Sequence, residues 1–218
     1  TSDGHYRQVM LRPMPVAEFY EETMSALEQL GIDVKIRTMP NEIADPIPFE
    51  QDLTHASYDE IYVRRFWHAL LSANDVLSRF RTGFLGKVSP VHFFWGSFDL
   101  AVTRFSGRSA PPHPGGVPHL PDTVAREAYS HEVSSAGFWP GGGVYDEAAF
   151  YSYAYPAPAG FAEARVLPAE AFWSKDLGEF ILPYAALRAS DDPDTTLLSF
   201  LQSTYVAAAV LAKWDRSA

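Results

Sequence analysis

The fold is decided by residues 89–107, which read SPVHFFWGSFDLAVTRFSG. Aromatic residues dominate this stretch from position 90 to 105, and aromatic and β-branched residues are typical of β-strands. Further strands are predicted at 124–134, at 150–155 and at 179–182. The second half of the chain is therefore predicted to hold a run of consecutive strands.

Helices are predicted on both sides of this run. Apolar residues at helical spacing indicate a helix at 15–30 and another at 58–81, and a capping-box pattern begins at Ser57. A last helix is predicted at 193–214, with Asp192 as its cap. Together the helices supply apolar faces that can cover a sheet.

Two shorter strands are predicted at 5–11 and 32–36, on either side of the first helix. The element order is then strand, helix, strand and helix, followed by the run of strands and a final helix. This order predicts an α+β fold, in which a largely antiparallel β-sheet has helices packed mainly on one face.

The start of the chain carries a turn signal, Ser2-Asp3-Gly4, directly before a predicted strand. Such a turn normally joins a strand to an earlier one. We therefore expect a single domain over residues 1–218 that lacks a strand-rich N-terminal segment.

Composition narrows the possible functions. The chain has a formal net charge of −10 and no cysteine. Acidic balance disfavours nucleic-acid binding, and the lack of cysteine excludes disulfides, iron–sulfur clusters and cysteine nucleophiles. No apolar stretch approaches the roughly 20 residues of a membrane span. We expect an acidic, soluble, cytoplasmic protein that binds neither nucleic acid nor membrane.

A family resemblance is carried by residues 89–107 and by a second motif at 126–142, REAYSHEVSSAGFWPGG. Two shorter sequences add to it, DPIPF at 45–49 and HASY at 55–58. These motifs resemble a bacterial family of uncharacterised proteins, a domain of unknown function, over essentially the whole chain. Members usually carry a further strand-rich N-terminal segment. The resemblance therefore implies that this chain packs against such a segment of the same protein. It implies no activity, cofactor or catalytic residue.

The two longer motifs hold the densest cluster of reactive side chains. Alternation along the first predicted strand places Trp95, Ser97 and Asp99 on one face. It places His92 and Arg104 on the other face, unless a bulge at the intervening glycine changes the parity. Any site in this region depends on which of these two faces is accessible.

A metal site is one interpretation of this cluster. On the second predicted strand Tyr129 and His131 share a face, and Glu132 points the opposite way. His92 and His131, with a carboxylate from Asp99 or Glu132, would suit a divalent metal such as zinc or iron in a metal-dependent enzyme. The alternative is that each histidine is an ordinary hydrogen-bonded residue of the sheet.

Acyl-transfer hydrolysis is a second interpretation. Ser97, His131 and Asp99 would act as nucleophile, base and orienting carboxylate if the two strands pair in a suitable register. A slip of one residue would place these groups on opposite faces of the sheet. The catalytic candidates of the two enzymatic interpretations are His131, Asp99, Ser97 and Glu132.

A small-molecule-binding pocket around residues 91–105 and 126–143 is the interpretation that we prefer. Its ligand-binding candidates are Trp95, Arg104, Arg126, Trp139 and Tyr151. Either arginine would hold a carboxylate or phosphate group bidentately. The competing explanation is that the aromatic residues form an ordinary core. A third class, a structural or homo-oligomer-forming subunit, would show an exposed aromatic patch instead of a pocket.

Overall fold

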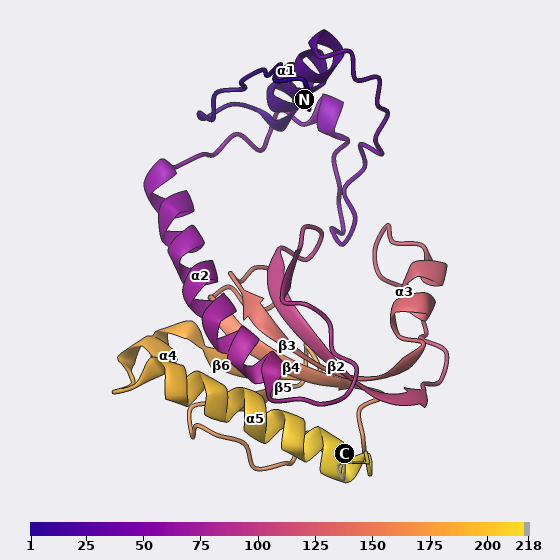
Figure 1. The fold of residues 1–218 in the computed structure, drawn as a ribbon, viewed down its shortest axis with the longest axis vertical. Helices are drawn as coiled ribbons and strands as arrows, with labels where there is room; N and C mark the ends of the chain where they lie inside the picture. The colour runs from indigo at the N-terminus through magenta and orange to yellow at the C-terminus, as the bar shows by residue number, and fades with distance from the viewer. Residues whose placement is uncertain (216–218) are drawn as a thin grey trace. The chain divides into compact units, whose positions relative to one another are not determined.

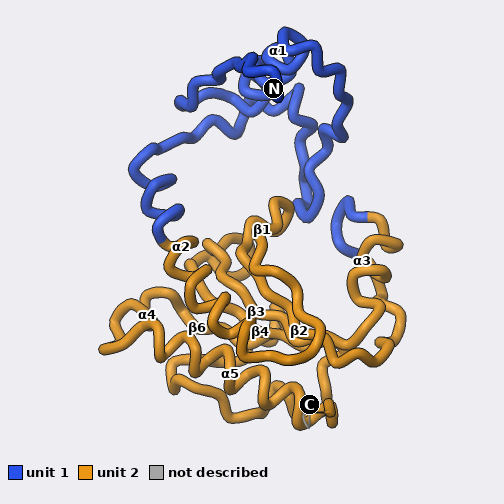
Figure 2. The backbone as a smooth tube through the Cα atoms, in the orientation of Figure 1, with its two compact units in different colours: residues 1–68, 116–120 blue, residues 69–115, 121–218 orange. Residues whose placement is uncertain are grey.

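The structure is a computed structural model that describes residues 1–215, and the chain forms two compact units (Figure 2). Unit 1 comprises residues 1–68 and 116–120. Unit 2 comprises residues 69–115 and the chain from residue 121 onward. Each unit has its own secondary structure, described in turn below.

Unit 2 is built on an antiparallel sheet with the strand order β1-β2-β3-β4-β6-β5 (Figure 1). The strands are β1 (His92–Phe94), β2 (Asp99–Ser109), β3 (His131–Trp139), β4 (Ala149–Tyr155), β5 (Phe172–Ser174) and β6 (Glu179–Pro183). Consecutive strands pair except where β6 lies between β4 and β5. The predicted α+β fold with an antiparallel sheet is therefore confirmed.

Helices cover one face of this sheet. The helices of unit 2 are the second half of α2 (Glu60–Thr82), α3 (Asp122–Ala128), α4 (Tyr184–Ala189) and α5 (Pro193–Leu211). α5 packs on β3 and β4, and α4 packs on β4 and β6 (Figure 1). Asp192 caps α5 by accepting a hydrogen bond from the Thr195 amide, as the sequence predicted.

Alternation along β2 assigns its side chains to the two faces. Leu100, Val102 and Arg104 point to the helix-covered face, where Arg104 reaches Phe80 at the end of α2. Asp99, Ala101 and Thr103 point to the opposite face. We call this opposite face the tyrosine face, because Tyr151 and Tyr153 of β4 lie on it in register with Gly137 and Ser135 of β3.

Two of the predicted strands were wrong in detail. The aromatic run at 90–105 is a hairpin, in which β1 and β2 are joined by a turn at residues 95–98. Trp95 and Ser97 therefore lie in a turn and not on a strand face. Phe98 has a positive φ of 59°, a conformation found in turns and uncommon for aromatic residues. The segment at 124–134 divides into the end of α3 and the start of β3.

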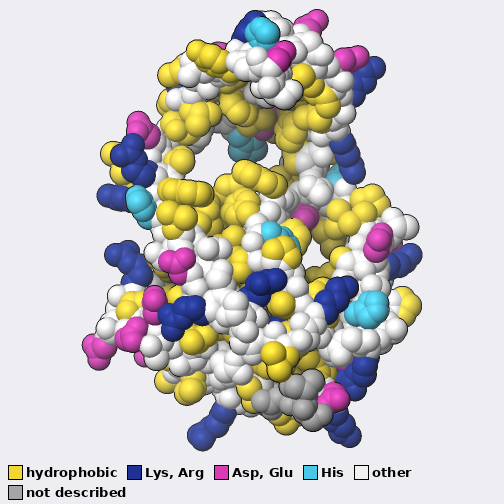
Figure 3. All heavy atoms as spheres, in the orientation of Figure 1, with side chains coloured by type: hydrophobic (Ala, Val, Ile, Leu, Met, Phe, Trp, Pro, Cys, Tyr) yellow, Lys and Arg dark blue, Asp and Glu magenta, His cyan; other side chains and the backbone are white. Residues whose placement is uncertain are grey.

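Unit 1 contains α1 (Val16–Gln29) and a short 3₁₀ helix, η1 (Phe49–Gln51), which contact each other. Residues 5–11 and 32–36 form no strand, contrary to the sequence-based expectation. A strand needs a paired neighbour, and these segments pair with no other part of the described chain. Apolar side chains remain exposed on unit 1, including Tyr6 and Met10. Figure 3 shows hydrophobic side chains in yellow on the surface of the molecule.

Within residues 1–215, no helix combines the length and the hydropathy that crossing a bilayer requires.

Candidate functional site

The tyrosine face carries the chemistry of unit 2. Buried Ala101, Ala149, Tyr151 and Ile181 form its floor, and the larger side chains of Trp139, Tyr145, Tyr153 and Leu177 pack against them. Small residues at the floor leave room for the rings to lie across the sheet. The face is thus aromatic, and its polar groups are hydroxyls, carboxylates and, on the edge strand β1, the imidazole of His92 opposite Ala101.

A hydrogen bond between Tyr151 and Asp99 crosses the sheet at the middle of this face. The Tyr151 hydroxyl donates to Oδ2 of Asp99, although β3 lies between their strands. The ring passes over Gly137, where an added Cβ would lie 2.6 Å from the Tyr151 hydroxyl and 2.5 Å from the Leu100 carbonyl oxygen. Only glycine at this position leaves space for the crossing.

Burial and the neighbouring negative charge of Asp99 raise the pKa of Tyr151 well above its ordinary value. Tyr151 therefore keeps its proton throughout the physiological range and remains a donor. The carboxyl group of Asp99, only 6% exposed, is held in place by this bond. A buried carboxylate with a fixed orientation is a feature of binding and catalytic sites.

A row of hydroxyl groups runs beside this pair. Thr103 and Ser135 share a hydrogen bond of 2.8 Å, and the hydroxyls of Tyr153 and Tyr129 share another of 2.8 Å. The pKa of Tyr153 is raised well above its ordinary value, mainly by burial and to a lesser extent by the nearby Tyr129. The row offers donors and acceptors that can rotate to suit a neighbouring group.

Glu179 is the second carboxyl of the tyrosine face. It lies two positions before Ile181, which pairs with Tyr151, so its side chain points to the same face. The pKa of Glu179 is raised to about 7, mainly by burial and to a lesser extent by the charge of Asp99. Among the described residues its side chain has no hydrogen-bond or ion-pair partner, although it is only half-exposed. Glu179 is therefore a desolvated carboxyl at the edge of an aromatic surface.

Three of the predicted site residues meet on this face: Asp99, Trp139 and Tyr151. A fourth, His92, lies on its β1 edge, opposite Ala101. Asp99 begins β2 and Trp139 ends β3, so both lie at one end of the sheet, with Tyr151 beside them on β4. Of residues 91–105 and 126–143, where the sequence predicted a pocket, Asp99 and Trp139 lie on this face. The neighbouring strand β4 contributes as much to the face as the two motifs.

The two histidines do not meet. His92 is level with Ala101 and Gly137, whereas His131 lies six positions from Gly137 along β3, roughly 20 Å away at about 3.3 Å per residue. The two imidazoles therefore cannot ligate one ion in this arrangement. In the described part of the chain, no group of three or more His, Asp or Glu side chains is arranged to hold a metal ion.

The same separation applies to the hydrolase arrangement. Ser97 lies in the β1–β2 turn, while His131 begins β3 at the other end of the sheet and is exposed. Asp99 bonds to Tyr151. The base His131 is therefore not within hydrogen-bond reach of Ser97 or Asp99, and the three groups do not form a catalytic set.

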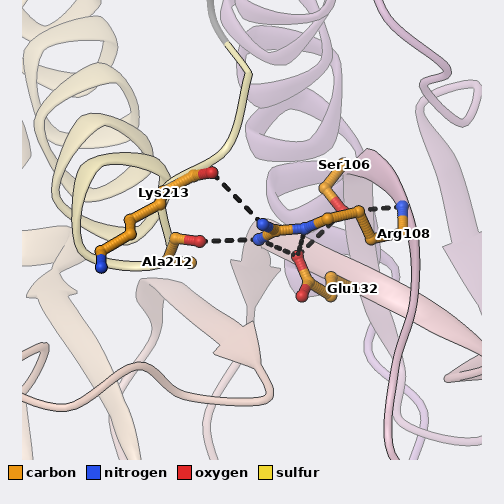
Figure 4. A network of polar contacts seen from close by, with 5 residues as sticks. All are labelled: Ser106, Arg108, Glu132, Ala212 and Lys213. Carbon is orange, nitrogen blue, oxygen red and sulfur yellow. Dashed lines mark hydrogen bonds and ion pairs between the residues drawn. The ribbon is translucent and has the colours of Figure 1, made fainter.

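Glu132, the other carboxylate candidate, belongs to a structural network (Figure 4). Its Oε2 accepts hydrogen bonds from Ser106 and from Nε and Nη2 of Arg108, at 2.7–3.0 Å. Arg108 also donates to the carbonyl oxygens of Ala212 and Lys213 beyond the end of α5. Figure 4 shows that Arg108 bridges the sheet and the C-terminal end of this helix.

The two arginine candidates have other roles. Arg104 is 1% exposed on the helix-covered face, with its guanidinium 3.4 Å from the Phe80 ring centroid and 4.3 Å from that of Tyr205. Burial lowers the pKa of Arg104 to about 10. Arg126 lies on α3, where it pairs with Asp122 at 3.4 Å. Neither arginine points to the tyrosine face alongside Asp99. The remaining candidate, Trp95, is 81% exposed in the hairpin turn.

Sequence reasoning missed Glu179, Ser135 and Thr103. Glu179 opens a short strand that the sequence did predict, but a single acidic residue beside a turn is usually solvated. A signal for Ser135 and Thr103 was available, because small hydroxyl residues in otherwise apolar strands are unusual at buried positions. Placing all three on one face requires the register of four strands.

The comparisons with known proteins identify a family. A family model described as "Family of unknown function (DUF5996)" matches residues 1–218. Comparison with curated proteins and with solved structures finds no match. Because the family model covers the whole chain, including both motifs that build the sheet, the chain belongs to the family of unknown function DUF5996.

Proposed function

We propose that this chain is a small-molecule-binding protein, and that the tyrosine face of unit 2 is its ligand-binding surface. The observation that carries the proposal is the side chain of Glu179, a half-buried carboxyl without a hydrogen-bond or ion-pair partner among residues 1–215. Burying a carboxyl without a partner costs free energy, which a protein tolerates where a ligand supplies the missing partner.

The composition of the face supports this proposal. Ligand sites are mostly apolar and aromatic surfaces with a few precisely placed polar groups. Here aromatic rings surround Asp99, whose orientation is fixed by Tyr151, and a hydroxyl row lies beside them. Polar groups fixed in this way can orient a ligand without being reorganised when it binds.

The proposal is tested by ligand screening with two matched variants. A panel of small aromatic molecules with cationic, neutral and anionic substituents is screened for a rise in melting temperature. We expect at least one class to stabilise the protein, and we expect Glu179→Gln to remove that stabilisation. Glu163→Gln serves as control, because Glu163 is an exposed glutamate of the same unit. Equal ligand shifts in both variants would contradict the proposed surface.

A further inference from the structure

The tyrosine face has an acidic character. It carries two carboxyl groups, Asp99 and Glu179, each of which raises the pKa of a neighbouring group on the face through its charge. Three arginines of the same unit are engaged elsewhere. Arg104 lies under the helices, Arg108 pairs with Glu132, and Arg126 pairs with Asp122. An anionic ligand would therefore meet the charges of Asp99 and Glu179 here, and none of these three arginines could pair with it.

The rings of the face favour the opposite charge. Tyr151 and Tyr153 are stacked with 6.1 Å between their centroids, and Trp139 and Tyr145 pack against the same floor. The face of an aromatic ring is electron-rich and attracts cations, tryptophan most strongly. Proteins use groups of aromatic rings to bind substituted ammonium groups.

Resting on the proposed function, we infer that the tyrosine face binds a small organic cation, namely an ammonium group carried on an apolar body. The ammonium group pairs with Glu179, and the apolar body contacts the rings of Trp139 and Tyr153. The hydroxyl row of Thr103, Ser135, Tyr153 and Tyr129 accepts any remaining N–H donors. Glu179 then acquires the partner that it lacks in the free protein.

The binding should depend on pH in a defined direction. The charge that acts on Glu179 is that of Asp99 from β2, and Glu179 in turn raises the pKa values of Tyr151 and Tyr153 on β4. His92 lies on the β1 edge of the same face, opposite Ala101. Both tyrosines keep their protons in this range because burial raises the pKa of each. Glu179, with its pKa at about 7, becomes negatively charged between pH 6 and pH 8. A cation should therefore bind more tightly at pH 8.

The test compares three probes that share one ring, using isothermal titration calorimetry on the full chain. The probes are 2-phenylethylamine, 2-phenylethanol and 3-phenylpropionate, which are cationic, neutral and anionic at pH 8. We expect the amine to bind at least about tenfold more tightly than the other two, because a hydrogen bond to a charged group contributes about 1.5 kcal/mol or more. Glu179→Gln should remove this preference and its pH dependence, whereas Glu163→Gln should retain both.

Each outcome separates the inference from the proposed function. If the alcohol or the carboxylate binds as tightly as the amine and Glu179→Gln weakens that binding, the ligand class is wrong and the binding surface stands. If Glu179→Gln leaves amine binding unchanged while its far-UV circular dichroism is native, the inference is overturned. If none of the three probes binds and the wider panel gives no shift, both the inference and the proposed function fail.

Discussion

The hydroxyl of Tyr151 on β4 donates a hydrogen bond to Asp99 on β2, across the intervening strand β3. The ring can span this distance because β3 presents Gly137 beneath it. Three strands thus contribute to one contact, which holds a buried carboxyl at the end of the sheet. The predictions below follow from this contact and from the charges around it.

Gly137→Ala should destabilise the protein. The added methyl group would lie within 2.6 Å of the Leu100 carbonyl oxygen and the Tyr151 hydroxyl, so the ring must leave Asp99. Overpacking of this kind costs roughly 1–3 kcal/mol. Urea denaturation measures the change in the free energy of unfolding. Gly83→Ala is the control, since a Cβ there meets its nearest atoms at 3.6 Å or more and little change is expected.

Tyr151→Phe should lower the free energy of unfolding by about 1–3 kcal/mol, because it removes the donor from a buried carboxyl and leaves the ring in place. Tyr145→Phe is the matched control. The Tyr145 hydroxyl makes no hydrogen bond within residues 1–215, and its ring also belongs to the tyrosine face. Equal stabilities of the two variants would show that the Asp99–Tyr151 bond contributes nothing.

Because of Glu179, we expect the free energy of unfolding to fall as the pH rises. Its folded-state pKa of about 7 lies above its ordinary value of 4.5, so the folded protein holds this proton more tightly than the unfolded chain. Its contribution is fully present below pH 4.5 and is lost as the pH rises towards 7. A shift of this size corresponds to about 3 kcal/mol. Denaturation at pH 5 and pH 8 should show that Glu179→Gln is more stable than the wild type at pH 8 and that its stability depends less on pH. An equal change in stability between pH 5 and pH 8 in the wild type and in Glu179→Gln would exclude this effect.

Arg104→Ala should be strongly destabilising, by about 2–5 kcal/mol, because the side chain fills the space between the sheet and the rings of Phe80 and Tyr205. Arg104→Lys should restore little, since an ammonium group is more strongly hydrated than a guanidinium and lacks its planar shape. Thermal denaturation checks both variants. Arg126→Ala is the control at an exposed position on α3, and it should change the free energy of unfolding by less than about 0.5 kcal/mol. If Arg126→Ala lowered the free energy of unfolding as much as Arg104→Ala, the structural role would not be specific to Arg104.

Much of the fold was predictable from local patterns. β4, β6 and the capped helix α5 match their predicted positions, because alternation, helical spacing and an Asp-Pro start are local signals. The β1–β2 hairpin was not predictable, since its turn lies inside an aromatic run and lacks the usual Asn-Gly or Asp-Gly pair. α3 was also missed, because seven residues are too few to show a helical period.

The candidate site was only partly predictable, for a different reason. Asp99 and Trp139 were identified because they lie in the two motifs, and Tyr151 because it lies in an aromatic predicted strand; the structure brings the three together. The metal-site interpretation required His92 and His131 to meet, yet the register of β2 and β3 separates them along the sheet. Glu179 joins the face only through the pairing of β6 with β4, a long-range contact that local sequence does not encode.

The most direct test of the proposed ligand surface is the ionisation of Glu179, followed through its side-chain carboxyl ¹³C resonance by NMR and assigned with Glu179→Gln. The account predicts a pKa of about 7 in the free protein, falling when 2-phenylethylamine is added, because a bound ammonium group stabilises the carboxylate. A pKa near the ordinary value of 4.5 that does not change with the amine would contradict it.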